Sequence, residues 1–257
     1  MPKSLAAAAV ACALAAGCAP RAVLTDPIVT DRPDFTESVE TVPRGWVQAE
    51  GGYTASRGDG VTAHTAGELL LRAGLAERVE LRVGLPSYTV AGRGDARVMG
   101  LGDASLGAKV ALWDGDSLRA WAPRTSLLVA TSLPTGHRDL RAPAAVPEAK
   151  LALGWDVGER ASFASNLNAA LPREAGARHG ELSASGSLGV ALGARAGAYA
   201  EWFGYFPQAT GAAASHYVNG GATYQLSPHV QLDARVGRGV GRVAEDWFMG
   251  VGAARRF

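Results

Sequence analysis

The chain has 257 residues, which suits one large all-β domain or two small ones, and its formal net charge is only +1. This balance gives no strong field for binding nucleic acid or acidic substrates. Hydrophobic residues make up 47% of the chain but are spread evenly, and no apolar run after the N-terminus is long enough for a transmembrane helix. Such a spread is typical of a chain that meets lipid with every second residue.

Residues 1–18 have the pattern of a secretory signal peptide, with Lys3 as the positive end and an apolar stretch over residues 5–16. Two cleavage sites fit this pattern. The sequence AAGC that ends at Cys18 resembles a lipoprotein box and would leave that cysteine lipidated, although Leu14 lies one place too early for the preferred spacing. Ordinary cleavage after a nearby small residue is the alternative. Both predict export from the cytoplasm.

Both cysteines of the chain lie within these first 18 residues. The mature chain therefore offers no disulfide framework, no cysteine-based metal site and no thiol nucleophile. Its five histidines are scattered, with no pair at the i, i+4 spacing of a helical metal site. We expect neither a cofactor nor a metal.

Residues 19–44 precede the first expected strand and show no strand alternation. They are polar and contain several prolines. We treat them either as a flexible periplasmic lead-in or as a partial plug that folds into the periplasmic mouth of a barrel and pairs with charges in its lumen. The charges of this segment are too many for a lipid-facing strand: Asp31, Arg32, Asp34 and Glu37.

Residues 45–257 repeat one pattern, in which segments of about ten residues alternate apolar with polar or small side chains. Short and long connections alternate between them without a break. Twelve strands are predicted, at 46–55, 66–75, 79–89, 102–112, 118–132, 148–156, 161–171, 181–191, 195–206, 216–226, 229–237 and 246–257. The long connections are 56–65, 90–101, 133–147, 172–180, 207–215 and 238–245. An even strand number with short turns at one end and long loops at the other predicts an antiparallel transmembrane β-barrel with both termini in the periplasm.

Charged side chains fall on one face of these strands. In 230–236, for example, Gln231, Asp233 and Arg235 oppose an apolar set. In a membrane barrel this wet face lines the lumen. The candidate lumen or selectivity residues are Glu50, Glu68, Arg72, Glu80, Arg82, Asp103, Lys109, Glu148, Lys150, Glu201, Asp233 and Arg235.

Both signs of charge are present in this set, which leaves two interpretations. The residues form either a polar ladder that sets pore width and selectivity or a structural ion-pair network that fills the interior of a narrow barrel. The network is favoured, because a twelve-stranded barrel is narrow enough for side chains to occlude much of it.

Aromatic residues lie near the ends of the expected strands, where girdles at the two membrane interfaces are expected. They are Trp46, Tyr53, Tyr88, Trp113, Trp121, Trp155, Phe206, Trp247 and Phe248. The final residue, Phe257, is the kind of terminal aromatic that barrel-assembly machinery reads. Arg255 interrupts the apolar row that leads to it.

Residues 30–38 (TDRPDFTES) carry a family resemblance. They are similar to the opening of a family of bacterial outer-membrane barrels labelled "transporter" or meta-pathway phenol-degradation proteins. Further similar stretches follow in the family's order at 42–45 (VPRG), 48–50 (QAE), 80–84 (ELRVG), 100–109 (GLGDASLGAK), 133–136 (LPTG) and 231–233 (QLD). The resemblance covers roughly residues 25–257. It implies a passive channel or binding barrel, often associated with uptake of aromatic or other hydrophobic compounds.

We therefore expect an outer-membrane channel for passive or facilitated uptake of small, hydrophobic or aromatic molecules. It would be a monomer, with lipid and assembly machinery as its partners. A structural or surface-binding barrel with an occluded lumen is the alternative. A lipid-modifying barrel enzyme has little support, because no spacing links His137, His179 or His216 to Ser132 or Ser215 as a catalytic pair. The glycine-rich stretch 237–241 precedes no helix and does not predict a phosphate site.

Overall fold

The computed structural model describes residues 25–115, 121–174, 176–241 and 244–257. The expected signal peptide at 1–18 and the lipidation candidate Cys18 lie outside this part of the chain. Every regular element in the described residues is a β-strand. No helix in this part is long and apolar enough to cross a membrane.

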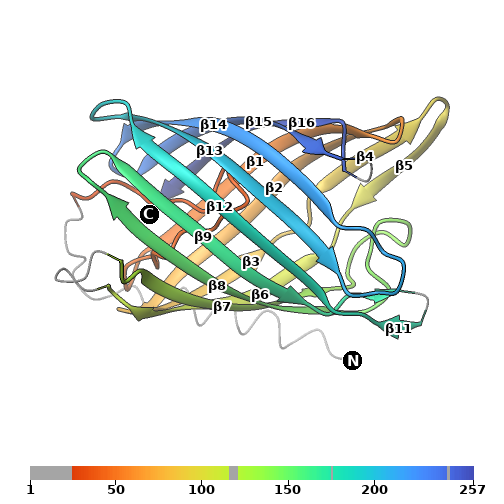
Figure 1. Cartoon of the computed structure of the whole chain (residues 1–257), viewed down its shortest axis with the longest axis horizontal. Helices are drawn as coiled ribbons and strands as arrows, with labels where there is room; N and C mark the ends of the chain where they lie inside the picture. Colours follow the sequence, from red (N-terminus) through yellow and green to blue (C-terminus); the bar gives the residue numbers. More distant parts are fainter. Residues whose placement is uncertain (1–24, 116–120, 175, 242–243) are drawn as a thin grey trace.

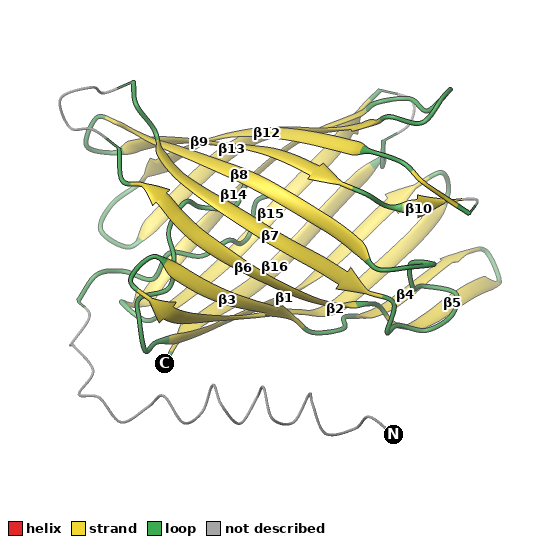
Figure 2. Cartoon of the chain, turned by 90° about the horizontal axis from the view of Figure 1, so that it is seen from below, coloured by secondary structure: helices red, strands yellow, loops and turns green. Residues whose placement is uncertain are grey.

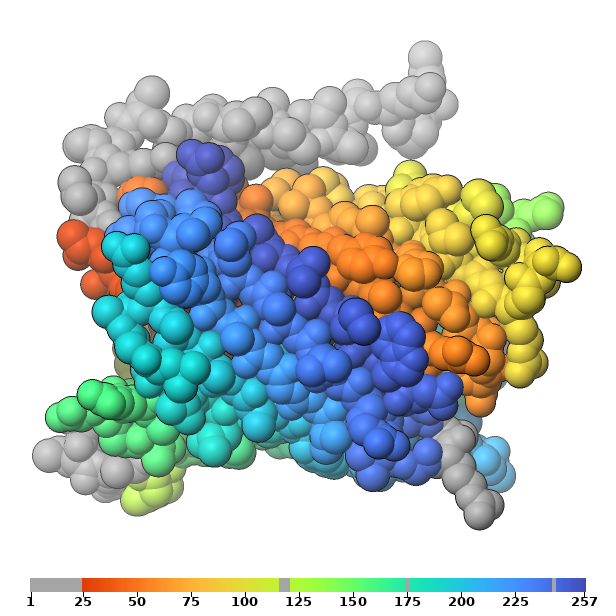
Figure 3. Space-filling model, turned by 90° about the horizontal axis from the view of Figure 1, so that it is seen from above, coloured from red at the N-terminus to blue at the C-terminus, as the bar shows by residue number. Residues whose placement is uncertain are grey.

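Twelve strands form a closed antiparallel barrel, as the period-two pattern predicts (Figures 1 and 2). Each strand pairs with its neighbour along the chain, and β1 pairs with both β2 and β16, which closes the cylinder. Figure 3 shows β14–β16 and β1–β2 as one continuous outer surface. The strands are β1 (Val47–Gly58), β2 (Val61–Ala76), β3 (Val79–Gly84), β6 (Ala104–Trp113), β7 (Arg124–Leu133), β8 (Val146–Val157), β9 (Ala161–Ala170), β12 (Glu181–Ala191), β13 (Ala196–Pro207), β14 (Ser215–Ser227), β15 (Val230–Val240) and β16 (Trp247–Arg256).

Four further strands lie beyond the cylinder wall. The hairpin of β4 (Tyr88–Arg93) and β5 (Ala96–Leu101) pairs with the first half of β2, so it prolongs the wall past β3 and β6. The short pair β10 (Arg173–Glu174) and β11 (Ala177–Arg178) forms a separate two-stranded sheet.

The predictions of long loops at 56–65 and 90–101 were wrong, because both regions are strand hairpins. β1 and β2 turn at Asp59 and Gly60, whose φ angles of 51° and 73° are those of a two-residue hairpin turn. Gly94, with φ of 57°, begins the equally tight turn between β4 and β5. Two residues suffice at each turn, so the strands continue through segments that their charged and small residues suggested were loops.

The two ends of the barrel differ, and we name them by their connections. The turn end carries the short connections after β2, β8, β12 and β14, together with residue 25 and Phe257. The loop end carries the β4–β5 hairpin and the longer connections after β7, β9, β13 and β15 (Figure 1). The expected alternation of short and long connections therefore holds, apart from the tight turn between β1 and β2 and the connection from β6 to β7. The short turn predicted at 114–117 and the strand predicted at 118–132 were wrong at this point, because β6 ends at Trp113 and β7 begins only at Arg124, after Pro123.

The barrel is polar inside and apolar outside. Glu50, Glu80 and Lys109 have no exposed surface, whereas Leu106 is 48% exposed and Val236 is 62% exposed. A water-soluble barrel would show the reverse arrangement. The wall is therefore built for lipid, as expected of a transmembrane barrel.

One residue expected in the aromatic girdle lies elsewhere. Phe248 is only 5% exposed and faces the lumen, because the even-numbered positions of β16 point inward with Ala254 and Arg256. Arg255 points outward, and its guanidinium lies 4.8 Å from the centre of the Phe257 ring. Arg255 thus covers the terminal ring instead of extending the apolar row.

Candidate functional site

Residues 25–44, which we name the lumen segment, lie inside the barrel wall. The segment enters at the turn end, where the Ile28 N–H donates to the Pro228 carbonyl at 2.8 Å. It reaches its apex at residues 34–36, beside Glu201 of β13. It then returns to the turn end and joins β1, where the Gly45 N–H donates to the Gly74 carbonyl at 2.9 Å.

Asp31 is the centre of a buried charge cluster. Its carboxylate lies 2.9 Å from Lys109 Nζ and 3.2 Å from Arg72 Nη1, and it also accepts a hydrogen bond from Arg82. Burial acts to raise the pKa of the Asp31 carboxyl, but Arg72, Lys109 and Arg82 outweigh burial and hold that pKa well below its ordinary range. Asp31 is therefore ionised at neutral pH and ties the segment to three strands.

Two wall carboxylates complete this cluster. Arg72 donates to Glu50 at 2.8 Å and to Glu80 at 2.9 Å, while Glu80 and Glu50 also accept backbone N–H groups of the segment. The cluster thus has three carboxylates and three cations, so its net charge is zero, and all six side chains are buried from solvent. Full pairing is what makes buried charges tolerable, because an unpaired one would be costly.

Two further charged residues, Arg32 and Glu37, fasten the segment on either side of Asp31, each with two ion pairs. Arg32 lies 3.0 Å from Glu68 and 3.5 Å from Asp233. Glu37 lies 2.8 Å from Lys150 and 3.0 Å from Arg82. The pKa of Glu37 is lowered, because Lys150 and Arg82 together outweigh the burial that acts to raise it.

A β-bulge aims Glu68 at Arg32. Glu68 has a positive φ of 37°, which is strained for a residue with a side chain, and the register of β2 against β1 shifts at this point. The Glu68 N–H donates to Ser87 Oγ at 3.1 Å, in the link between β3 and β4. The register shift of β2 and the inward direction of the Glu68 carboxylate are therefore parts of one local feature.

The apex is held by a single carboxylate and by hydroxyl groups. The N–H groups of Phe35 and Thr36 donate to Glu201 at 2.9 and 2.6 Å, and the Thr36 hydroxyl donates to the same carboxylate at 2.6 Å. Asp34 accepts a hydrogen bond from Ser187 at 3.1 Å. Burial, and then the neighbouring Glu201 carboxylate, raise the pKa of Asp34 well above its ordinary value. No cation of the described residues pairs with Asp34.

Several wall glycines provide room for the lumen segment. A Cβ on Gly52 would lie 2.2 Å from the Arg32 guanidinium, and one on Gly252 would lie 2.5 Å from it. A Cβ on Gly74 would lie 2.2 Å from the Pro43 carbonyl oxygen. Gly52 and Gly74 lie at register shifts of their strands, and glycine within a strand marks a bulge or a close approach of another chain segment.

Aromatic rings line one side of the lumen, between the apex and the loop end. The Phe35 ring stacks on Phe203 at a centroid distance of 4.5 Å, and Phe203 stacks on Tyr217 at 4.7 Å. Tyr205 and Phe248 pack against the same group. These rings border a cavity of about 500 Å³ towards the loop end, which we name the loop-end cavity; its other lining residues are Thr54, Ser56, Thr65, Glu68, Arg235 and Glu245.

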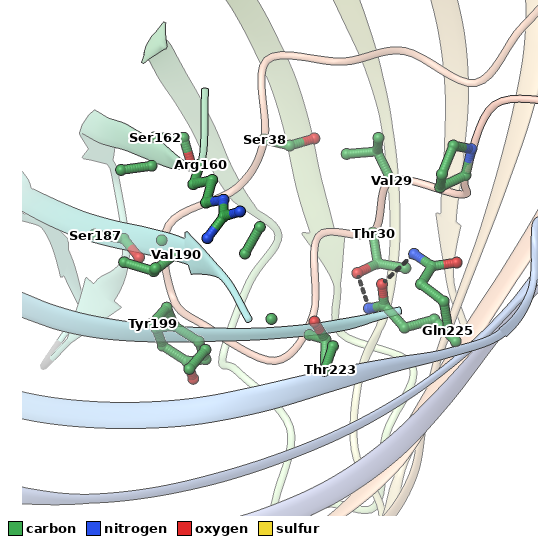
Figure 4. Close-up of a pocket in the computed structure, with 18 of the residues that line it drawn as sticks. Val29, Thr30, Ser38, Arg160, Ser162, Ser187, Val190, Tyr199, Thr223 and Gln225 are labelled. Atoms are coloured by element: carbon green, nitrogen blue, oxygen red, sulfur yellow. Dashed lines mark hydrogen bonds between the residues drawn. The ribbon is translucent and has the colours of Figure 1, made fainter. Parts of the chain in front are cut away.

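A second cavity of about 640 Å³ lies on the opposite side of the apex, towards the turn end (Figure 4). Its wall is made of small side chains from β9, β12 and β13, including Ser162 and Ser187, while Thr223 and Gln225 of β14 face them. Arg160 points into the space. Asp34 and Thr36 line this turn-end cavity, whereas Phe35 lines the loop-end cavity. Consecutive residues of the apex therefore separate the two spaces.

The structure brings most of the predicted lumen residues together around the lumen segment. Asp103 and Glu148 are different. Asp103 accepts hydrogen bonds from the N–H groups of Gly136 and Ala142 at 2.9 and 2.8 Å, so it holds the connection after β7. Glu148 lines a smaller cavity of about 290 Å³ with Glu37 and Arg82. The lumen residues with contacts to the segment are Glu50, Glu68, Arg72, Glu80, Arg82, Lys109, Lys150, Glu201, Asp233 and Arg235.

Other features of the site were not predicted from the sequence. These are the stacked rings, the wall glycines, and neutral groups such as Asn166, whose side chain accepts the Glu37 N–H at 2.7 Å. Within the described part of the chain, no group of three or more His, Cys, Asp or Glu residues is placed to hold a metal ion.

The family model described as "Putative MetA-pathway of phenol degradation" matches residues 30–257. This chain belongs to that family. The match begins inside the lumen segment and includes every strand of the barrel, so the segment and its barrel are parts of one family pattern. No curated protein shows a sequence match to the chain.

Solved structures with a similar fold are bacterial outer-membrane proteins. The COG4313 outer membrane channel from Pseudomonas putida F1 is similar over 85% of this chain and 98% of its own, with 16% identity and a TM-score of 0.64. The KdgM porin is similar over 81% of this chain and 99% of its own, with 14% identity and a TM-score of 0.53. At these identities, the likeness establishes the outer-membrane barrel fold alone.

Proposed function

We propose that this protein is an outer-membrane channel through which small, hydrophobic or aromatic molecules enter by passive or facilitated diffusion. The observation that carries the proposal is the pair of cavities on opposite sides of residues 34–36. A solute needs to pass only this apex to move from one cavity to the other. The lumen segment would act as a partial plug whose apex loosens while its charged side stays in place.

The substrate class follows from the loop-end cavity. Its aromatic rings favour flat molecules, while its hydroxyl groups and the charged Glu68, Arg235 and Glu245 favour a polar substituent on them. The matched family is described by phenol degradation, and the solved relatives are named as a channel and a porin. These descriptions belong to the relatives, but they agree with the chemistry of this cavity.

The difference between the two barrel ends supports one placement in the membrane. We infer that the turn end faces the periplasm, so that both termini of the mature chain are periplasmic. Lipid covers the apolar wall, and the assembly machinery reads Phe257 during insertion. The protein would act as a monomer, because the closed sheet leaves no unpaired edge along the cylinder. Cys18 remains the lipidation candidate.

The experiment that tests the proposal is planar-bilayer recording of the purified, folded protein. We expect small single-channel currents, with a higher open probability in Glu201→Gln, because the apex donates to both oxygens of Glu201 and the amide has only one acceptor oxygen, so at least one apex hydrogen bond is lost. Asp114→Asn is the matched control, since Asp114 is an exposed carboxylate at the turn end. A complete absence of current in wild type and in Glu201→Gln would contradict the channel proposal.

The second candidate is a structural or surface-binding barrel with an occluded lumen. The observation that favours it is the neutral cluster of six buried charges around Asp31, which fills one side of the interior. This candidate predicts no current and no uptake of small solutes into vesicles. A catalytic role is not proposed, and failure of the purified barrel to release fatty acid from phospholipid would agree with that choice.

A further inference from the structure

The loop-end cavity has a floor built as a stack of three rings. Phe35, Phe203 and Tyr217 lie nearly parallel, with interplanar angles of 10° and 9° between successive rings. Phe203 is the middle ring and is only 8% exposed. Phe35 is therefore an end ring, and it borders the cavity.

The three rings differ in how the backbone holds them. Phe203 and Tyr217 are cross-strand partners on β13 and β14, so the sheet fixes their positions. Phe35 belongs to the lumen segment and is not part of any strand. The barrel wall thus provides Phe203 and Tyr217 as a fixed stacking surface, and the ring that occupies the other face of Phe203 comes from the apex of the lumen segment.

We propose that Phe35 occupies a binding site for the ring of a small aromatic solute, and that a solute ring stacked on Phe203 in its place releases the apex. This inference rests on the proposed channel function and adds a ligand-controlled step to it. The solute class is a single planar ring with a hydroxyl or similar polar substituent. The ring would take the Phe203 face, while Thr54, Ser56 or Arg235 would meet the substituent across the cavity.

The energetics allow such an exchange. One ring replaces another on the same surface, so the stacking lost by Phe35 is recovered by the solute. A ligand shifts a conformational equilibrium only through its different affinities for the two states. Here the solute binds this site only in the state in which Phe35 has left it, because the solute ring and the Phe35 ring cannot both occupy the same face of Phe203.

The test compares phenol with cyclohexanol in planar-bilayer recordings. The two alcohols have nearly the same size and the same hydroxyl group, but only phenol can stack. We expect phenol to raise the open probability of wild type and cyclohexanol to leave it unchanged. In Phe203→Leu, the half-maximal phenol concentration should rise about twofold to tenfold, as expected for the loss of one stacked pair.

Two further variants sharpen the comparison. Phe35→Leu should be more open without phenol and should no longer distinguish the two alcohols. Phe163→Leu is the matched control, because Phe163 points to the outside of β9 and should respond as wild type does. Tyr217→Leu replaces Phe203→Leu if the latter fails to show the folded band on an unboiled gel.

A binding measurement separates this inference from the channel proposal. The 19F NMR line of 4-fluorophenol should broaden with folded wild type and much less with Phe203→Leu, whether or not current flows. An equal response to phenol and cyclohexanol, or equal broadening with both proteins, would overturn the ring site. Currents that do not change when phenol is added would overturn the ligand-controlled step but would not contradict the channel proposal.

Discussion

The lumen segment is held by two different kinds of chemistry on its two sides. Towards β1, β2, β3 and β6, it is fixed by buried ions, with Asp31 in contact with Arg72, Arg82 and Lys109. Towards β12, β13 and β14, it is held at the apex by Glu201, by hydroxyl groups and by stacked rings. Cavities adjoin the apex on both sides, whereas the ion cluster is buried.

This difference supports our proposal that the apex moves while the ion cluster stays in place. Separating a buried ion pair leaves charges without partners in a space of low dielectric constant, which is strongly unfavourable. Apex hydrogen bonds can be exchanged for bonds to water, because cavities adjoin the apex on both sides, and this exchange costs less than the separation of buried ions. We therefore name the first region the anchored side and the second region, residues 34–36 with their partners, the releasable side.

The largest effect is expected from Arg72→Met. Removing this guanidinium leaves Asp31, Glu50 and Glu80 with too few cations, so the folded barrel should lose roughly 3–5 kcal/mol of stability. Urea titration of the barrel in lipid vesicles, followed by the shift of the unboiled gel band, measures this loss. Arg78→Met is the control, because the Arg78–Asp114 pair is mostly exposed and contributes little. Equal losses in both variants would contradict the anchored side.

A smaller effect is expected from Gly74→Ala. The added methyl would meet the Val42 and Pro43 carbonyl oxygens at 2.3 and 2.2 Å, so the end of the lumen segment must shift, at a cost of about 1–3 kcal/mol. Limited proteolysis of the segment in folded protein should be faster than in wild type. Gly189→Ala is the control, since the nearest atom to its Cβ is the mobile Ser162 hydroxyl. Unchanged proteolysis in Gly74→Ala would mean that this close approach does not seat the segment.

The sequence predicted the barrel because its wall follows a local rule. Inward and outward residues alternate along each strand, so the twelve strands and their two faces can be predicted without knowing which strands pair. The prediction that Phe248 lies in the aromatic girdle was wrong, because an aromatic ring near a strand end is compatible with either face of the barrel wall. Only the alternation along β16 shows that Phe248 faces the lumen. The hairpin turn at Asp59-Gly60 was present in the sequence, but its charged and small neighbours suggested a longer loop.

The site was less predictable because its contacts join distant positions. Asp31 and Lys109 are 78 residues apart, and nothing local to either residue indicates that they meet. The charges of the lumen segment did suggest pairing with lumen charges, but not which pairs form. Inward glycines such as Gly74 were a usable indication, because a glycine within a strand marks a bulge or a place where another segment comes close.

The releasable side should respond to pH in the direction set by Asp34. Burial and Glu201 raise its pKa, so ionised Asp34 disfavours the seated apex, and this penalty disappears as pH falls through the raised pKa. Asp31, whose pKa is lowered, stays ionised at the pH at which Asp34 is protonated and keeps the anchored side intact. Lowering the pH should therefore lower the open probability in bilayers. Asp34→Asn should remove this response; a response that persists in Asp34→Asn would have to arise from another group.

The smallest effect is expected from Lys150→Gln, at a residue that lies between the two sides. Lys150 pairs with Glu37 at 2.8 Å, but Glu37 also has Arg82 at 3.0 Å, so its carboxylate keeps a cation when Lys150 is neutralised. Both side chains of the Lys150 pair are mostly buried, but the remaining cation limits the loss to roughly 1.5 kcal/mol. The same urea titration measures it. A loss as large as that in Arg72→Met would mean that the anchored side extends to β8, and that the boundary with the releasable side lies closer to the apex than residue 37.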